Sequence, residues 1–188
     1  MASKGINIAA VILALRILTL LTLVASVVVL LLDTYKLSDG EKTTFKDIFA
    51  YRYVISTASI GALYLILQLP LATYYAVTEK RLVRGKLLPR IDFYGDKLIS
   101  LLLATGVGAG FAVTFELKKI LPDAFDGFIA LAQLAGGAVG SEFIDLLQQE
   151  RSKIPGFLNM GYIAAGILLA GCVFMALISV LSSINRTK

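Results

Sequence analysis

The sequence contains no histidine and no tryptophan, and only one of its 188 residues is a cysteine. Without histidine, the chain lacks the commonest zinc ligand and the commonest general base near neutral pH. Cys172 lies alone in an apolar run, so no intramolecular disulfide can form. The sequence also lacks a P-loop, a zinc motif, a Gly-x-Ser-x-Gly elbow and usefully spaced carboxylate pairs. We therefore expect neither an enzyme nor a cofactor or metal site.

Charge is scarce as well: 16% of the residues are charged and 57% are hydrophobic. The apolar residues gather in four runs, 6–32, 53–77, 91–115 and 159–184, each long enough to cross a hydrocarbon core of ~30 Å as a helix. The first run is too long for the hydrophobic region of a signal peptide. The sequence predicts an all-α, four-transmembrane-helix bundle that forms a single domain over 1–188.

The distribution of charge predicts the orientation of this bundle. The inner loop 78–90, with Asp92 just beyond it, and the two termini together carry eight basic and two acidic residues. The outer loops 33–52 and 116–158 carry eight basic and ten acidic residues. Because positive loops stay in the cytoplasm, we expect the N- and C-termini to be cytoplasmic and the basic side to face anionic lipid. The net charge of +5 thus indicates membrane topology and no nucleic-acid binding.

The outer loop 116–158 contains two short apolar segments. The segment 128–140 is rich in glycine and too short to span a membrane, so we interpret it as loop or interfacial structure. The segment "SEFIDLLQQERSK" predicts a short helix that is capped by Ser141 and ends before Pro155. Both segments could contact an extracellular partner.

Arg16 is the one arginine inside a membrane run, where a charge costs about 2.5–3.5 kcal/mol on insertion scales. Its side chain can escape by snorkelling to the headgroups, or it can meet a buried acid. Asp92 stands at the edge of the third run and is counted with the inner side, so Asp96 is the only acid deeper inside a run. Helical side chains lean toward the helix N-terminus, which brings the arginine toward the depth of Asp96. We favour a bidentate ion pair between the two side chains.

The role expected for this pair is structural, since it would determine which helix faces which. A buried ion pair need not add net stability, but removal of one partner leaves an uncompensated charge. We therefore predict that Arg16→Leu alone misfolds or misassembles.

Small residues recur at helical spacing in the third and fourth runs. Gly106 and Gly110 form a Gly-x-x-x-Gly motif, a second row contains Gly108 between Ala104 and Ala112, and Gly161 is followed by Ala165 one turn later. Rows of this kind let helix backbones approach closely. They favour packing within the bundle, assembly with other chains, or both.

The segments "FAYRYVISTASIGALYLILQL" and "IDFYGDKLISLLLATG", with an arginine in the first span and an aspartate in the third, resemble the plant Casparian strip membrane domain-like proteins, relatives of the MARVEL tetraspan domain. The resemblance covers nearly the whole chain. It implies a multi-pass plasma-membrane protein that forms homo- and hetero-oligomers with related four-span proteins. Strip-forming members build an immobile scaffold that directs local cell-wall modification. The first outer loop, "DGEKTTFKDIFAYR", departs from those members, which carry a Leu-Pro-Phe-Phe type of segment there.

The function expected from the residues and the resemblance together is a non-enzymatic membrane scaffold. The alternative is a small transporter or channel that uses the Arg16–Asp96 pair, because intramembrane charges often mark transport pathways. No chain of ionisable residues and no inverted repeat supports this alternative in the sequence.

Overall fold

The computed structural model describes residues 8–36, 42–78, 87–134 and 141–187. Four helices make up most of it: α1 (Ile8–Leu32), α2 (Phe49–Thr78), α3 (Leu87–Leu134) and α4 (Ser141–Thr187). All four are long and apolar enough to cross a membrane. The all-helical, four-span prediction is therefore confirmed for the described residues. The basic segment 79–86 and the glycines Gly136, Gly137 and Gly140 lie outside the described residues.

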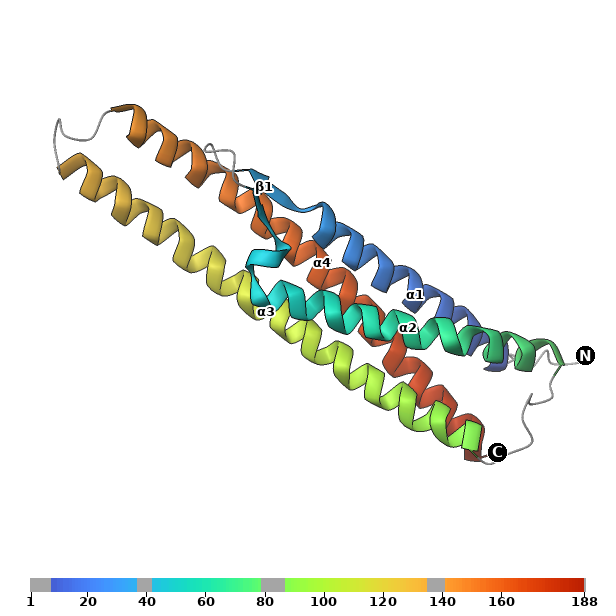
Figure 1. Ribbon diagram of the computed structural model, residues 1–188. Coiled ribbons are helices and arrows are strands. Elements are labelled where there is room, and N and C mark those ends of the chain that lie inside the picture. The colour runs from blue at the N-terminus through green and yellow to red at the C-terminus, as the bar shows by residue number, and fades with distance from the viewer. Residues whose placement is uncertain (1–7, 37–41, 79–86, 135–140, 188) are drawn as a thin grey trace, which may run out of the picture.

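The helices form one bundle in which α1 contacts α2 and α4, and α3 contacts the same two helices. The start of α1 and the end of α4 lie at one end of the bundle, and the connection from α1 to α2 lies at the other (Figure 1). A hairpin of two short antiparallel strands, β1 (Thr34–Lys36) and β2 (Lys42–Thr44), forms this connection, with Thr34 opposite Thr44. A 3-10 turn, η1 (Phe45–Asp47), then leads into α2. The sequence did not predict the strands, which contain three residues each.

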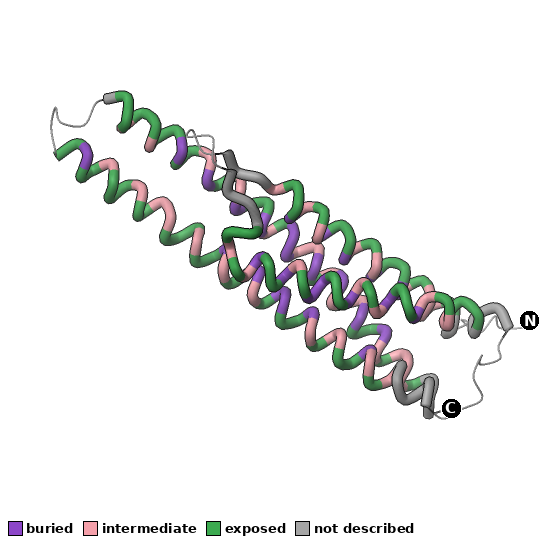
Figure 2. Tube along the Cα trace, viewed as in Figure 1, coloured by how far each residue is buried: buried purple, intermediate pink, exposed green. Residues whose placement is uncertain are grey.

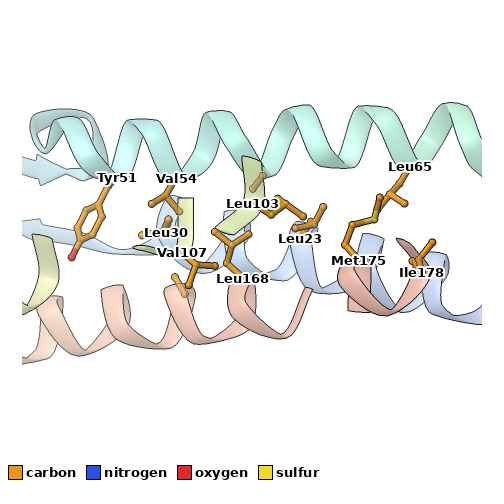
Figure 3. Close-up of a cluster of buried hydrophobic side chains, with 12 residues drawn as sticks. Leu23, Leu30, Tyr51, Val54, Leu65, Leu103, Val107, Leu168, Met175 and Ile178 are labelled. Carbon is orange, nitrogen blue, oxygen red and sulfur yellow. The ribbon is translucent and has the colours of Figure 1, made fainter. Parts of the chain in front are cut away.

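The interior contains aliphatic side chains from all four helices, shown in Figure 3. They include Leu23 from α1, Leu65 from α2, Leu103 from α3 and Leu168 from α4, which are all fully buried. The outward faces carry large apolar residues too, such as Leu21, Leu63, Leu101 and Leu177. A bundle that is apolar on both its inner and outer faces fits a lipid environment.

The third and fourth helices are much longer than the sequence predicted. Within the expected loop over 116–158, residues 116–134 and 141–158 are helical, because α3 runs on to Leu134 and α4 already begins at Ser141. Ser141 does start a helix as expected, but this helix passes through Pro155 and continues into the fourth span. At 1.5 Å per residue each helix is about 70 Å long, more than twice the hydrocarbon thickness.

The part of α3 and α4 beyond the outer ends of α1 and α2 forms an arm that consists of 116–134 and 141–158 (Figure 1). The arm is helical because its two halves pack on each other: Ala132, Ile154 and Leu158 are buried there. A proline removes one backbone donor, so Pro122 and Pro155 each cost one helical hydrogen bond, which this packing can offset.

Candidate functional site

Arg16 and Asp96 lie in contact inside the bundle. The Arg16 Nη2 atom is 3.2 Å from Asp96 Oδ2, with 5% of the arginine side chain and none of the aspartate side chain exposed. Arg16 comes from α1 and Asp96 from α3, two helices that both start at the same end of the bundle. The two intramembrane charges therefore compensate each other within one chain.

Two residues of α2 connect this pair into a closed ring. Arg16 Nη1 donates to Gln68 Oε1 at 3.0 Å, and Gln68 Nε2 donates to the Tyr64 hydroxyl at 3.3 Å. The Tyr64 hydroxyl in turn donates to Asp96 Oδ1 at 2.7 Å. We call Arg16, Tyr64, Gln68 and Asp96 the polar cluster. It joins α1, α2 and α3 through buried polar contacts.

The ion pair does not have the bidentate geometry that the sequence analysis favoured. Nη2 alone contacts both carboxylate oxygens, at 3.3 and 3.2 Å, because Nη1 is engaged by Gln68. The arginine thus divides its donors between two helices, and its Nε atom has no hydrogen-bond partner. This division links α2 to the pair, which a two-pronged contact with Asp96 alone would not do.

The local sequence explains how Tyr64, Gln68 and Asp96 meet. Tyr64 and Gln68 are four residues apart on α2, so they lie on the same helix face. Gly95 precedes Asp96, and a Cβ atom at Gly95 would lie 2.6 Å from the Tyr64 hydroxyl oxygen. The absence of a side chain there allows Tyr64 to reach Asp96. Sequence reasoning assigned no role to Tyr64 or Gln68, although their spacing within an apolar span was a usable signal.

The chemistry of the polar cluster is that of a structural contact. Its two charges cancel, and its neutral members supply hydrogen bonds to the charged ones. Among the described residues, no group of three or more histidine, cysteine, aspartate or glutamate side chains could hold a metal ion. Lys97, next to Asp96, is exposed, and its amino group lies 3.8 Å from the ring centroid of Phe93.

Three of the five small residues predicted for packing are glycines that face the interior. A Cβ atom at Gly106 would collide with Thr57 of α2, and one at Gly161 would collide with the Tyr51 hydroxyl. Gly110 lies against Ala165 and Val54, at 3.2 and 3.3 Å from an added Cβ atom. These glycines bring α2, α3 and α4 together, so the first small-residue row belongs to the bundle itself.

Gly108 points in a different direction. It is exposed, and a Cβ atom added there meets nothing within 4 Å. Ala104 and Ala112, one turn to either side, are exposed as well. We call these three residues the outer small row. All three lie on the exposed side of α3, which leaves this row accessible to another helix.

The outer end of the bundle has a second polar contact. The hydroxyl groups of Tyr51 and Thr114 are 2.9 Å apart, and Tyr51 is 1% exposed. Asp33 follows directly after α1, and its Oδ2 atom is buried with no hydrogen-bond partner. Burial raises the pKa of Asp33 from 3.8 to about 6.

Comparison with known proteins agrees with this architecture. Residues 6–148 match the model of the Casparian strip membrane protein domain. The CASP-like protein 4D1 of Ricinus communis is 36% identical over 179 residues, which cover 94% of this chain and 90% of that protein. The CASP-like protein 4D2 of Arabidopsis thaliana is 34% identical over 188 residues, 98% and 94% of the two chains. No solved structure matches the chain.

Proposed function

This chain belongs to the family of the Casparian strip membrane protein domain, and from that premise we propose that it is a non-enzymatic scaffold of the plasma membrane. In this proposal the protein self-associates, or pairs with related four-span proteins, and so organises a membrane domain. The termini face the cytoplasm and the arm faces the outside. There the domain would guide local cell-wall modification.

The observation that carries the proposal is the closure of the polar cluster. Arg16 and Asp96 satisfy each other and bind two neutral side chains of α2, all at one depth of the bundle. A proton or ion pathway needs ionisable groups at successive depths across the membrane. The cluster instead holds three helices in a set arrangement, which supports a structural role.

Self-association is proposed to use the outer small row. In lipid, helices associate through close packing of small residues, because lipid tails are as apolar as leucine and supply no hydrophobic driving force. Ala104, Gly108 and Ala112 form such a surface on the outside of α3. Gly108→Leu would place a large side chain there without touching the chain's own interior.

The experiment is photobleaching recovery of the C-terminally tagged protein in a plant plasma membrane. We expect patches with slow recovery for the wild type and fast, uniform recovery for Gly108→Leu at an equal protein level. Leu101→Ile, on the same outward side of α3 but outside the row, is the matched control and should recover as slowly as the wild type. Fast recovery of the wild type itself would contradict a scaffold built by this protein alone.

A flux assay tests the transport alternative. The purified protein in liposomes should pass protons no faster than empty liposomes under an imposed pH gradient. If the protein does pass protons and Asp96→Asn abolishes this flux, the scaffold proposal is wrong and the protein is a transporter.

A further inference from the structure

The outer half of the arm exposes an apolar stripe. On α3 the stripe contains Ile120, Ala124, Phe128 and Leu131, and Phe143 and Leu146 of α4 add to the apolar surface near the tip. These side chains are solvent-exposed: 55% for Ile120, 63% for Phe128 and 65% for Leu131 (Figure 2 shows the arm). We call 120–134 of α3 and 142–150 of α4 the distal arm. Its surface holds more exposed large apolar side chains than a solvated helix pair needs.

The stripe continues a face of α3 that is covered inside the bundle. Gly106 lies against Thr57 of α2, and Val113, seven residues further on, packs on the core. Ile120 is another seven residues along the same face, where α2, which begins at Phe49, no longer reaches. The geometry of the stripe is thus that of a helix-packing surface whose partner helix has ended.

The charge on the distal arm has one sign. Between residues 120 and 150 the sequence has five acids and no lysine or arginine. Asp126 pairs with Arg151 and Glu150 with Lys153, both just beyond the distal arm. Asp123, Glu142 and Asp145 are exposed acids with no ion pair among the described residues. They flank the apolar surface with negative charge.

We propose that the distal arm docks a basic amphipathic helix of a separate protein, laid along α3 in line with α2. Its apolar side chains would cover Ile120, Ala124 and Leu131, and its lysines or arginines would face the unpaired acids. Like charges disfavour the arm of a second copy, which is equally acidic, and an anionic lipid surface. The inference shares the topology of the proposed scaffold but is independent of self-association through the outer small row.

The test measures binding of a synthetic helical peptide to the full chain in phosphatidylcholine nanodiscs. The peptide has 21 residues, with leucine at heptad a and d positions and lysine beside them, and it carries a fluorophore for anisotropy. The comparison peptides are a scrambled sequence and one with glutamate in place of lysine. We expect the basic helix to bind at least about tenfold more tightly than either, with affinity falling as salt rises.

Two arm variants and a control locate the binding surface. Leu131→Gln and Asp123→Lys should each weaken binding about tenfold, the effect of losing one strong interface contact. Ala130→Gln is also exposed on α3 but points about 100° away from Leu131, so it should bind like the wild type. All three changes are at exposed positions, and their thermal unfolding should match that of the wild type.

Three outcomes would overturn the inference. The first is equal binding of the basic and scrambled peptides, and the second is equal loss with Ala130→Gln and Leu131→Gln. The third is a different occupant of the stripe: a dimer abolished by Leu131→Gln, or lipid contact reported by a dye at Phe128→Cys. Leu131→Gln should leave photobleaching recovery slow. A failure of helix docking at the distal arm can therefore be distinguished from a failure of the proposed scaffold.

Discussion

Arg16 carries a high electrostatic cost, because it is 4% exposed in a helix that contains no other charged residue. Three hydrogen bonds from two of its nitrogens offset this cost: Nη1 donates to Gln68, and Nη2 donates to both carboxylate oxygens of Asp96. Without the arginine, Asp96 would remain a fully buried carboxylate whose Oδ1 atom accepts from the Tyr64 hydroxyl but whose charge has lost its counterion. The two residues should therefore depend on each other far more than either contributes alone.

A double substitution tests that dependence. Arg16→Leu alone should lower the free energy of unfolding by about 3–5 kcal/mol, because it leaves an uncompensated buried carboxylate. Arg16→Leu with Asp96→Leu should recover most of this loss, since no charge then remains buried. Thermal unfolding in detergent would measure both. A double variant as unstable as the single one would show that the charges act separately.

The raised pKa of Asp33, at the outer end of the bundle, predicts how the stability of the fold changes with pH. Its pKa in the folded protein is raised to about 6 by burial, above its usual 3.8, so folding favours the protonated form. The buried side chain does not destabilise the fold below about pH 4, where it is protonated in both the folded and the unfolded protein. As the pH rises through 6, the folded protein must bury the ionised carboxylate, and stability is lost. Asp33→Asn should therefore be more stable than the wild type at pH 7.5 and equally stable at pH 4. Unfolding temperatures of both proteins at the two pH values test this, and a gap that widens toward acid pH would contradict it.

Among the helices, α3 and α4 differ most from expectation, and for α4 the reason is Pro155. A proline after a polar stretch usually marks the end of a helix, so Pro155 was taken as a boundary. The structure continues the helix because the arm halves bury Ala132, Ile154 and Leu158 against each other. Local propensity predicted the break, and contacts between α3 and α4 outweighed it.

The arm should consequently gain stability when a proline is removed. Pro122→Ala restores a backbone donor toward the carbonyl of Lys118 and should stabilise α3 there by up to ~3 kcal/mol. Amide hydrogen exchange around residues 118–126 should slow accordingly. Lys119→Ala, an exposed change with no backbone effect, is the control. Unchanged exchange in Pro122→Ala would mean that the arm already compensates for the missing bond.

For the whole molecule, the number of spans and the charge distribution together predict sidedness. In the proposed topology, four crossings put both termini on one side and the arm on the other, and the positive-inside rule makes the side with the basic segments the cytoplasm. In this proposed topology the arm lies outside the cell.

Cysteine labelling of intact cells checks this topology in a Cys172→Ala background. Gln148→Cys, exposed on the arm, should react with a membrane-impermeant maleimide without permeabilisation. A cysteine added after Lys188 should react only after permeabilisation. The reverse labelling pattern would show that the topology is opposite to the proposed one, with the arm in the cytoplasm.

The sequence by itself determined the class of the protein, the four apolar spans and the approach of Arg16 to Asp96. Composition and run length are enough for the first two, because a span depends only on about 20 consecutive apolar residues. The ion pair could be predicted because Asp96 is the only acid that lies deeper than the edge of a span. The sequence did not predict which glycines face the interior and which face outward, because the spacing of a motif does not say which helix face meets a neighbouring helix.

Only the tertiary structure decided the rest. Tyr64 and Gln68 joined the pair because α2 lies beside α1 and α3, and Gly95 makes room for that contact. Gly106 turned inward and Gly108 outward through the rotation of α3 in the bundle. The arm became helical because its halves cover each other. Each of these outcomes depends on packing between distant segments, a long-range energy that no local pattern in the chain contains.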